Sequence, residues 1–464
     1  MRKFLFFALV AIGMVACHAE NETVSRTTLP EEVGIEVADA SPMGATRSYE
    51  EALAIAEQSI SLLESGDETR AQRRVIRGDG QCVTRATTRS GGVADTLFYI
   101  FNFENNEGFS VVAANRNVSP LIAVTEQGNY TYGEPTGVEP FDDYMERATE
   151  YATRDIIIDL PDSLPAFPLN PTPQFRKDTV TREFERYGPY LQTKWGQTGL
   201  YGEECPYGIA GCCTAAVTQI MAYHNAPSSI LITYEGSPYI GQTFGLNWSE
   251  ILKHTQDESS PYAAYCSTYA HFAIPILFRE VAERLDTRFD VDTNNDGVYD
   301  AASSTGNKVL NGLPTMGFTC SGLSLKKDDD SSGYNNVDTF KAILKQNIKD
   351  AKPVLMGGQD SENGRHMWVV DGHLYHEFVV YYYTHNSLLP GVDEDDGYSL
   401  TDTRDVTRDW LHINWGWKGT CNGYYLFDVF ATLDAERYDD TSDLYGDRPD
   451  FNFEDGIIMI TIND

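Results

Sequence analysis

Hydrophobic and polar positions change their period along the chain, and these changes separate the predicted elements. Apolar residues recur at helical spacing in residues 48–64, where Ser48 and Glu51 form a capping-box signature. The alternating aromatic residues 97–103, a turn at 105–108 and the apolar residues 109–114 predict a β-hairpin. A third strand is predicted at 121–125 and a helix around 141–154. Residues 46–158 therefore form a small α+β unit.

The second half of the chain places its helices first and its strands later. Helical patterns occupy residues 213–224, 274–286 and 338–350, and apolar and aromatic strand patterns dominate from Pro353 to the end. This order predicts an α+β domain with an antiparallel sheet, over residues 183–464. Five prolines between positions 161 and 173 predict an extended, protease-accessible linker over residues 159–182, whose cleavage is expected near Arg176 and Lys177.

The N-terminal segment predicts export. Arg2 and Lys3 precede an apolar stretch, residues 4–16, that is too short to span a bilayer, so residues 1–16 are interpreted as a signal peptide. Small residues before Cys17 resemble a bacterial lipobox, which implies cleavage and acylation of that thiol. The alternative is an ordinary secretory signal cut near Ala16 or Ala19. Residues 17–45 are polar and predict a flexible tether.

The composition and net charge limit the classes of molecule that the protein is expected to bind. Aromatic residues make up 12% and apolar residues 41% of the 464 residues, as in folded proteins, and the net charge is -34. That charge argues against nucleic acid or an anionic membrane surface, so a lipid on Cys17 is the one membrane contact expected. Of the eight cysteines, seven remain if Cys17 is acylated. An odd number in an exported protein suggests a reactive thiol.

The candidate chemistry centres on residues 211–224. Cys212 and Cys213 follow a glycine at the start of a predicted helix, where the helix dipole and free N–H groups stabilise a thiolate. Both thiols can equally be buried hydrophobic residues or disulfide halves. His366 begins a strand after a polar, glycine-rich stretch, Asn414 lies in Asn-Trp-Gly-Trp, and Gln197 precedes the cysteines. These side chains can supply a base (His366), a group that orients it (Asn414) and an oxyanion donor (Gln197). The alternative is that the histidine has only a structural role, as most histidines do.

A second motif suggests a cation site. Asp292, Asn294 and Asp296 alternate before Gly297, as in a calcium-binding loop. The twelfth position is Ser303 where such loops carry Glu, so an acidic surface turn is the alternative. Thiol catalysis itself requires no cofactor.

Taken together, these motifs resemble those of the streptopain family of papain-like cysteine peptidases. The similarity rests on Trp-Gly-Gln197, on Gly-Cys212 through Pro227, on His366-x-x-Val-x-Asp-Gly372 and on His412-x-Asn-Trp-Gly-Trp417. Residues 102–114 are similar to the inhibitory pro-domain of that family. The resemblance implies a papain-like fold over 183–464 that follows a small α+β pro-domain.

The resemblance also implies roles for individual residues. Cys212 stands seven positions before Gln219 and matches the nucleophile, while Cys213 occupies a position that is usually Val. His366 matches the general base, Asn414 its orienting group, Trp415 a shielding indole and Gln197 the oxyanion donor. Cys213 is then a buried thiol or a disulfide half, with Cys205, Cys266 or Cys320 as partner. Residues 373–410 depart from the family pattern as a long insertion, which contains the strand pattern 377–384 and a loop expected to flank the substrate cleft.

The expected protein is an exported cysteine endopeptidase made as an autoinhibited zymogen. It would act on proteins or peptides, carry its pro-domain as an intramolecular inhibitor, and reside as an outer-membrane or cell-surface lipoprotein, or be secreted after processing. The alternatives are a non-catalytic surface binding protein and another thiol acyltransferase or amidase on the same fold.

Overall fold

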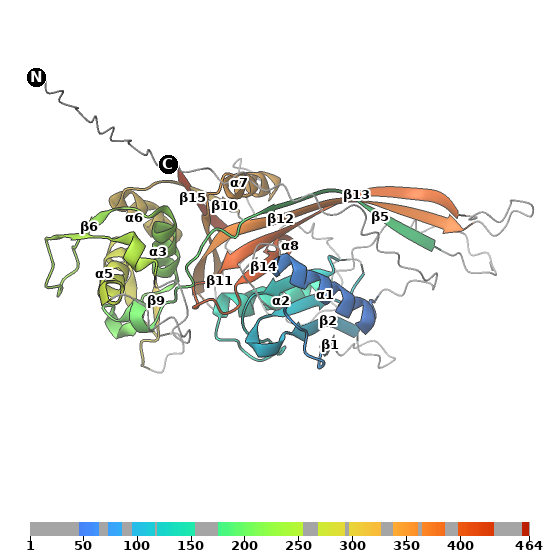
Figure 1. Ribbon diagram of the computed structural model, residues 1–464, viewed down its shortest axis with the longest axis horizontal. Coiled ribbons are helices and arrows are strands. Elements are labelled where there is room, and N and C mark those ends of the chain that lie inside the picture. Colours follow the sequence, from blue (N-terminus) through green and yellow to red (C-terminus); the bar gives the residue numbers. More distant parts are fainter. Residues whose placement is uncertain are drawn as a thin grey trace, which may run out of the picture. The chain divides into compact units, whose positions relative to one another are not determined.

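The computed structural model describes most of the chain from residue 46 onward (Figure 1). The described residues are 46–64, 73–85, 95–116, 118–153, 175–253, 268–292, 297–325, 337–360, 364–385, 398–430 and 457–463. The predicted signal peptide, the tether with Cys17, and Cys266 lie outside these ranges. Within them, no helix has the length and apolar character needed to cross a membrane.

The N-terminal part confirms the predicted pattern of helices and strands. Its elements are α1 (Tyr49–Glu64), β1 (Gln81–Arg85), β2 (Asp95–Asn102), β3 (Phe109–Ala113), β4 (Leu121–Thr125) and α2 (Glu139–Thr153). The capping box forms as predicted: Glu51 Oε2 accepts from the Ser48 N–H at 2.7 Å, and Ser48 Oγ accepts from the Glu51 N–H at 3.2 Å. Strands β2 and β3 pair antiparallel as the predicted hairpin.

Along the C-terminal part of the chain, most of the helices come first and the long strands of an antiparallel sheet follow. Its helices are α3 (Cys212–His224), α4 (Trp248–Ile251), α5 (Thr268–Arg284), α6 (Gly306–Gly312), α7 (Val337–Lys349) and α8 (Phe427–Phe430). Its strands are β5 (Phe175–Tyr187), β6 (Ser229–Leu231), β7 (Thr243–Gly245), β8 (Arg288–Val291), β9 (Ala301–Ser303), β10 (Thr319–Leu325), β11 (Val354–Asp360), β12 (Gly364–His385), β13 (Tyr398–Asn414), β14 (Gly423–Leu426) and β15 (Ile457–Asn463). The fold class is α+β, as predicted.

One continuous sheet joins the two parts. Its strand order is β1-β2-β3-β4-β14-β13-β12-β11-β15-β10, and β5 pairs separately with β12. The junction is the antiparallel pair β4–β14, in which Gly423 lies opposite Thr125 and Tyr425 opposite Ala123. The N-terminal part therefore extends the C-terminal sheet by edge-to-edge hydrogen bonding, which local sequence patterns did not predict.

The helix predicted at residues 274–286 begins earlier, as α5, and two further segments differ from the prediction. Residues 175–182, expected to be the end of an extended linker, belong to β5, which pairs with β12 from Thr384 to His373. The strand predicted at residues 377–384 is confirmed as part of β12, and this distal half of β12 pairs with residues 398–410 of β13, where a loop beside the cleft was expected. In Figure 1 the three strands run side by side. Residues 386–397 lie outside the described part.

Two large hydrophobic clusters lie on either side of the sheet's central strands. One packs α3 and α5 against residues of β11, β12 and β15. The other includes α2 side chains together with side chains of β13, β14 and α8. In it, the rings of Phe141 and Tyr144 contact Tyr425 at centroid distances of 6.1 and 5.0 Å. The N-terminal part thus shares a core with the C-terminal part.

Candidate active site

The two adjacent cysteines form the first turn of α3. Gly211 precedes the helix with φ 86°, a conformation that favours glycine, and a Cβ there would lie 2.7 Å from the Ala302 carbonyl oxygen. Cys212 and Cys213 are each 6% exposed. The helix ends at His224 because Asn225 adopts the left-handed conformation. The sequence therefore fixes both ends of the helix that presents the thiols.

Cys212 lies against the start of β12. The protonation of its thiol is influenced by the side chains of Cys213 and His366 and by the backbone of Met367. The pKa of Cys212 falls well below its ordinary value, chiefly because of Cys213 and, against the effect of burial, because of His366. Burial acts to lower the pKa of His366, but the hydrogen bond and charge of Cys212 raise it overall. This arrangement favours a thiolate beside an imidazolium.

Cys213 turns to different surroundings. Besides Cys212 it contacts the backbone of Ser304, which follows β9, and its pKa is raised well above the ordinary value, first by Cys212 and then by burial. In the described part of the chain, no disulfide is formed by Cys205, Cys212, Cys213 or Cys320. The disulfide pairing of Cys213 with Cys205 or Cys320 is therefore wrong, whereas Cys266 lies outside the described residues.

Gln197 lies next to the start of α3. Its carbonyl accepts a hydrogen bond of 2.8 Å from the Ala210 N–H, two residues before Cys212. Its side-chain Nε2 is buried, and no hydrogen-bond partner for it occurs in the described part of the chain. A buried amide donor without a partner is costly, and it is available to a negatively charged oxygen.

Asn414 occupies a different set of contacts from the one predicted. Its Nδ2 donates to the Thr193 carbonyl at 2.8 Å and to Gln219 Oε1 at 3.1 Å, and its Oδ1 accepts from the Gly416 N–H at 3.1 Å. The hydrogen bond from His366 to Asn414 is not among the contacts of the described residues. The structure thus joins Asn414 to α3 through Gln219, a buried residue for which the sequence predicted no role.

The indole beside His366 is that of Trp417, with ring centroids 6.2 Å apart. Trp415 is fully buried, donates from Nε1 to the Cys421 carbonyl at 3.1 Å, and stacks near Trp368. The shielding role predicted for Trp415 stays a prediction, and the ring contact with His366 is made by Trp417. Both tryptophans belong to the same motif, and Gly416, with φ 81°, turns the chain between them.

The N-terminal part reaches the same histidine. Glu139, at the start of α2, places Oε2 at 3.7 Å from His366 Nε2, and this nitrogen has no hydrogen-bond partner among the described residues. The charges of Glu139 and Asp143 contribute to the raised pKa of His366. Sequence patterns gave no signal for this contact because it joins residues far apart in the chain.

A second charged cluster crosses the boundary between the two parts. His412 Nδ1 lies 2.6 Å from Asp371 Oδ1, and its Nε2 lies 3.3 Å from Oε1 of Glu126, which follows β4. Lys194 Nζ lies 2.9 Å from the other Glu126 oxygen. Burial acts to lower the pKa of His412, but the two carboxylates raise it to about 9. His412 is thus held as a cation.

The remaining candidates lie elsewhere. Asp292 Oδ2 accepts from the Gly297 N–H at 2.8 Å, while Asn294 and Asp296 lie outside the described residues, so the predicted calcium loop stays a prediction.

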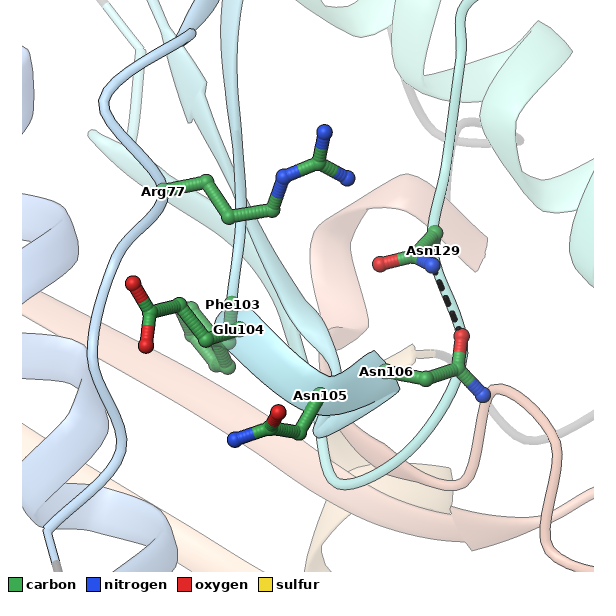
Figure 2. A pocket seen from close by; sticks show the side chains of 6 residues that line it. All are labelled: Arg77, Phe103, Glu104, Asn105, Asn106 and Asn129. Atoms are coloured by element: carbon green, nitrogen blue, oxygen red, sulfur yellow. Dashed lines mark hydrogen bonds between the residues drawn. The ribbon is translucent and has the colours of Figure 1, made fainter.

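A polar cavity of about 360 Å³ opens on the N-terminal part between Arg77 and Asn129. Figure 2 shows its lining, with Asn129 hydrogen-bonded to Asn106 at 2.8 Å. None of the thiol-site residues lines this cavity.

Comparisons with known families divide the chain at the same place. The family model described as the Peptidase C10 family matches residues 195–425. The model described as Spi protease inhibitor matches residues 40–150. The first range contains Gln197, Cys212, His366 and Asn414, and the second contains β4 and most of α2.

Individual proteins are similar over most of the chain. Streptopain of Streptococcus pyogenes is 21% identical over 360 residues, which cover 73% of this chain and 76% of streptopain. A solved fragment of prointerpain A from Prevotella intermedia is 18% identical, with a TM-score of 0.48, covering 82% of this chain and 98% of the fragment. Active interpain A of the same organism is 19% identical, with a TM-score of 0.34 over 52% of this chain and 85% of its own.

Proposed function

The chain belongs to the streptopain family, peptidase family C10, and is an autoinhibited cysteine endopeptidase; on that basis we propose that Cys212 is its nucleophile and His366 its general acid and base. The observation that carries the assignment is the position of Cys212 at the N-terminus of α3, where the side chain of His366, at the start of β12, lowers the pKa of its thiol. A thiolate at a helix N-terminus beside an imidazolium is the arrangement that nucleophilic cysteine catalysis requires.

The proposed reaction proceeds in two steps. The Cys212 sulfur attacks the scissile carbonyl carbon, a C–S bond forms, and His366 gives its proton to the departing amine as the C–N bond breaks. A water molecule then loses a proton to His366 and attacks the thioester, and the C–S bond breaks to restore the thiolate. In this proposal the Gln197 amide and the backbone N–H of Cys212 hold the oxyanion in both steps, which the Gln197 Nε2, without a partner among the described residues, supports.

The inhibitory contact we propose is the approach of α2 to His366. Glu139 and Asp143 place carboxylates toward the imidazole that must move protons in catalysis. A carboxylate beside an imidazolium stabilises that charged form and opposes proton donation. The shared core and the β4–β14 pairing hold α2 in that position.

We further propose that the protein is exported and anchored by a lipid on Cys17, or released after the linker is cut. The motif before Cys17 supports this proposal. Incorporation of labelled palmitate that Cys17→Ser abolishes would support it, and equal labelling of the variant would refute it. A structural calcium ion at Asp292, Asn294 and Asp296 remains a prediction from the sequence.

Cys212→Ala in the full chain tests the catalytic assignment. We expect cleavage of a casein-type substrate to fall about 1,000-fold or more, because the nucleophile acts as a unit with its base. Reaction with an epoxysuccinyl inhibitor should also disappear. If Cys213→Ala abolishes cleavage and Cys212→Ala does not, the nucleophile is Cys213 and the assignment is wrong.

A further inference from the structure

Gln219 of α3 lies at the centre of a buried polar network that the reaction described above does not use. The exposed fractions of Gln219, Thr193 and Asn414 are 0%, 2% and 3%. The Oε1 atom of this glutamine accepts hydrogen bonds from Thr193 Oγ1 at 3.0 Å, from the Trp195 N–H at 3.2 Å and from Asn414 Nδ2 at 3.1 Å. Its Nε2 donates to Asn414 Oδ1 at 3.2 Å. One side chain of α3 therefore binds two other segments of the chain.

Asn414 ties the network to the same segment a second time. Its Nδ2 also donates to the Thr193 carbonyl at 2.8 Å, and its Oδ1 accepts from the Gly416 N–H at 3.1 Å. Residues 193–195 are thus held by the Thr193 carbonyl and hydroxyl and by the Trp195 N–H. A buried network of this kind resists displacement, because any shift would leave buried polar groups without partners.

Gln219 stands on the face of α3 that carries the nucleophile. It follows Cys212 by seven positions, which is about two helical turns. Seven steps of 100° return to within roughly 20° of the starting direction, and they advance about 10 Å along the helix axis. Gln219 therefore acts at a distance from the thiol and not on the reacting atoms.

The segment that Gln219 holds leads directly to the proposed oxyanion donor. Only two residues of chain separate the anchored Trp195 from Gln197, a reach of at most roughly 7 Å. The Gln197 carbonyl accepts from the Ala210 N–H at 2.8 Å, beside the start of α3. Its buried Nε2 has no hydrogen-bond partner within the described part of the chain. The hydrogen bonds to Gln219 therefore limit where this amide can lie.

We propose that Gln219 is a positioning residue for catalysis: it fixes residues 193–195 along α3 and so sets the place of the Gln197 amide relative to the Cys212 sulfur. This inference rests on the proposed oxyanion role of Gln197. Gln219 then affects the rate through the donor that it positions, and it leaves the thiolate and the imidazole unaltered.

Gln219→Met tests this role, because it removes the amide and keeps an unbranched side chain of similar length. In the enzyme produced from the full chain, we expect kcat per titratable thiol to fall about 30-fold with little change in KM. Alkylation of Cys212 by iodoacetamide should keep the parent rate, since attack on a saturated carbon forms no oxyanion. Gln346→Met, at an exposed position of α7, is the matched control and should keep the parent kcat.

A pair of substitutions at Thr193 tests the same network from the other side. Thr193→Val removes the hydroxyl that donates to Gln219 and keeps the shape of the side chain, so kcat should fall a few-fold. Thr193→Ser keeps the hydroxyl and should keep the parent kcat. Circular dichroism reports whether each variant is folded. If Gln219→Met does not fold, the Thr193 pair carries the test.

Combination with Gln197→Glu identifies the route of the effect. If Gln219 acts through Gln197, adding Gln219→Met or Thr193→Val to Gln197→Glu should lower kcat no further, because the positioned donor is already absent. Losses that multiply, a parent kcat in the folded single variants, or a matching loss of alkylation would each refute the proposal. A Gln197→Glu chain with the parent kcat would instead refute the oxyanion role on which the proposal rests.

Discussion

Gln197 carries a buried amide nitrogen that lacks a partner among the described residues. If that nitrogen stabilises the oxyanion, its removal should act on the transition state and leave ground-state binding unchanged. We expect Gln197→Glu to lower kcat about 100-fold or more with little change in KM, because a carboxylate of the same shape cannot donate. Steady-state kinetics on a peptide substrate measure both constants. A rise in KM with kcat preserved would assign Gln197 to substrate binding instead.

Glu139 provides a second test at the scale of one residue. Glu139→Gln removes a negative charge 3.7 Å from His366 Nε2, so the pKa of His366 should fall. In the uncut chain, we expect Cys212 to react several-fold more slowly with a small alkylating reagent, because a less protonated His366 stabilises the Cys212 thiolate less. Glu150→Gln is the matched control, because Glu150 is exposed on the last turn of the same helix. Equal alkylation rates in both variants would contradict the role of Glu139.

The sequence predicted correctly that Cys212 and His366 lie together, but it did not predict the contacts of the other site residues. Cys212 and His366 come together because each stands at the start of an element whose pattern is plain in the sequence. Asn414 and Trp415 do not reach His366, because Asn414 binds Gln219 and Trp415 packs into the shared core. Such choices depend on neighbours distant in sequence, which a single-chain pattern does not record.

At the scale of elements, the helices with a clear amphipathic period were predicted from the sequence, whereas strand β5 was not. Helices α1 and α7 carry clear amphipathic periods, whereas residues 175–187 alternate mainly charged and hydroxyl side chains after a proline-rich stretch. This strand forms because β12 extends far enough to pair with it over residues 373–384. Its stability comes from tertiary pairing, so local propensity could not reveal it.

The pairing of β5 shifts the expected activation cut. Arg176 and Lys177 lie in this strand opposite Tyr383 and Tyr382, and a protease needs extended, unpaired chain. We expect the mature enzyme to keep β5 and to begin before Phe175. N-terminal sequencing of the processed protein measures this directly, and an Arg176→Ala/Lys177→Ala chain should be processed at the parent rate. A mature N-terminus just after Lys177 would show that β5 opens before cleavage.

At the scale of the whole molecule, the inhibitory part and the catalytic part are built as one sheet with a shared core. Pairing of β4 with β14 joins residues about 300 positions apart, and the packing of Phe141 and Tyr144 on Tyr425 joins residues about 280 positions apart. Each half of this arrangement was visible in the sequence as an ordinary strand or helix. The pairing of the two halves could not be predicted, because the sequence of an edge strand does not indicate which other strand will pair with it.

The cluster of Glu126, Lys194, His412 and Asp371 makes the stability of that union depend on pH. His412 has a folded-state pKa of about 9 against an ordinary value of 6.5, so its stabilising charge is fully present below pH 6.5. That contribution is lost as the pH rises through about 9. Denaturant unfolding of the uncut Cys212→Ala chain should therefore show a free energy of unfolding that declines over this range.

Glu126→Gln tests which contact carries the effect. It leaves the cations of Lys194 and His412 without the carboxylate that lies between them, so the free energy of unfolding should drop by about 3 kcal/mol below pH 6.5. The decline with pH should also begin earlier, because one of the two carboxylates that raise the pKa of His412 is gone. Glu134→Gln, an exposed change on the same part of the chain, should alter neither quantity. If the two variants unfold alike, the sheet junction and the shared core hold the inhibitory part without help from this cluster, and activation should then be insensitive to His412.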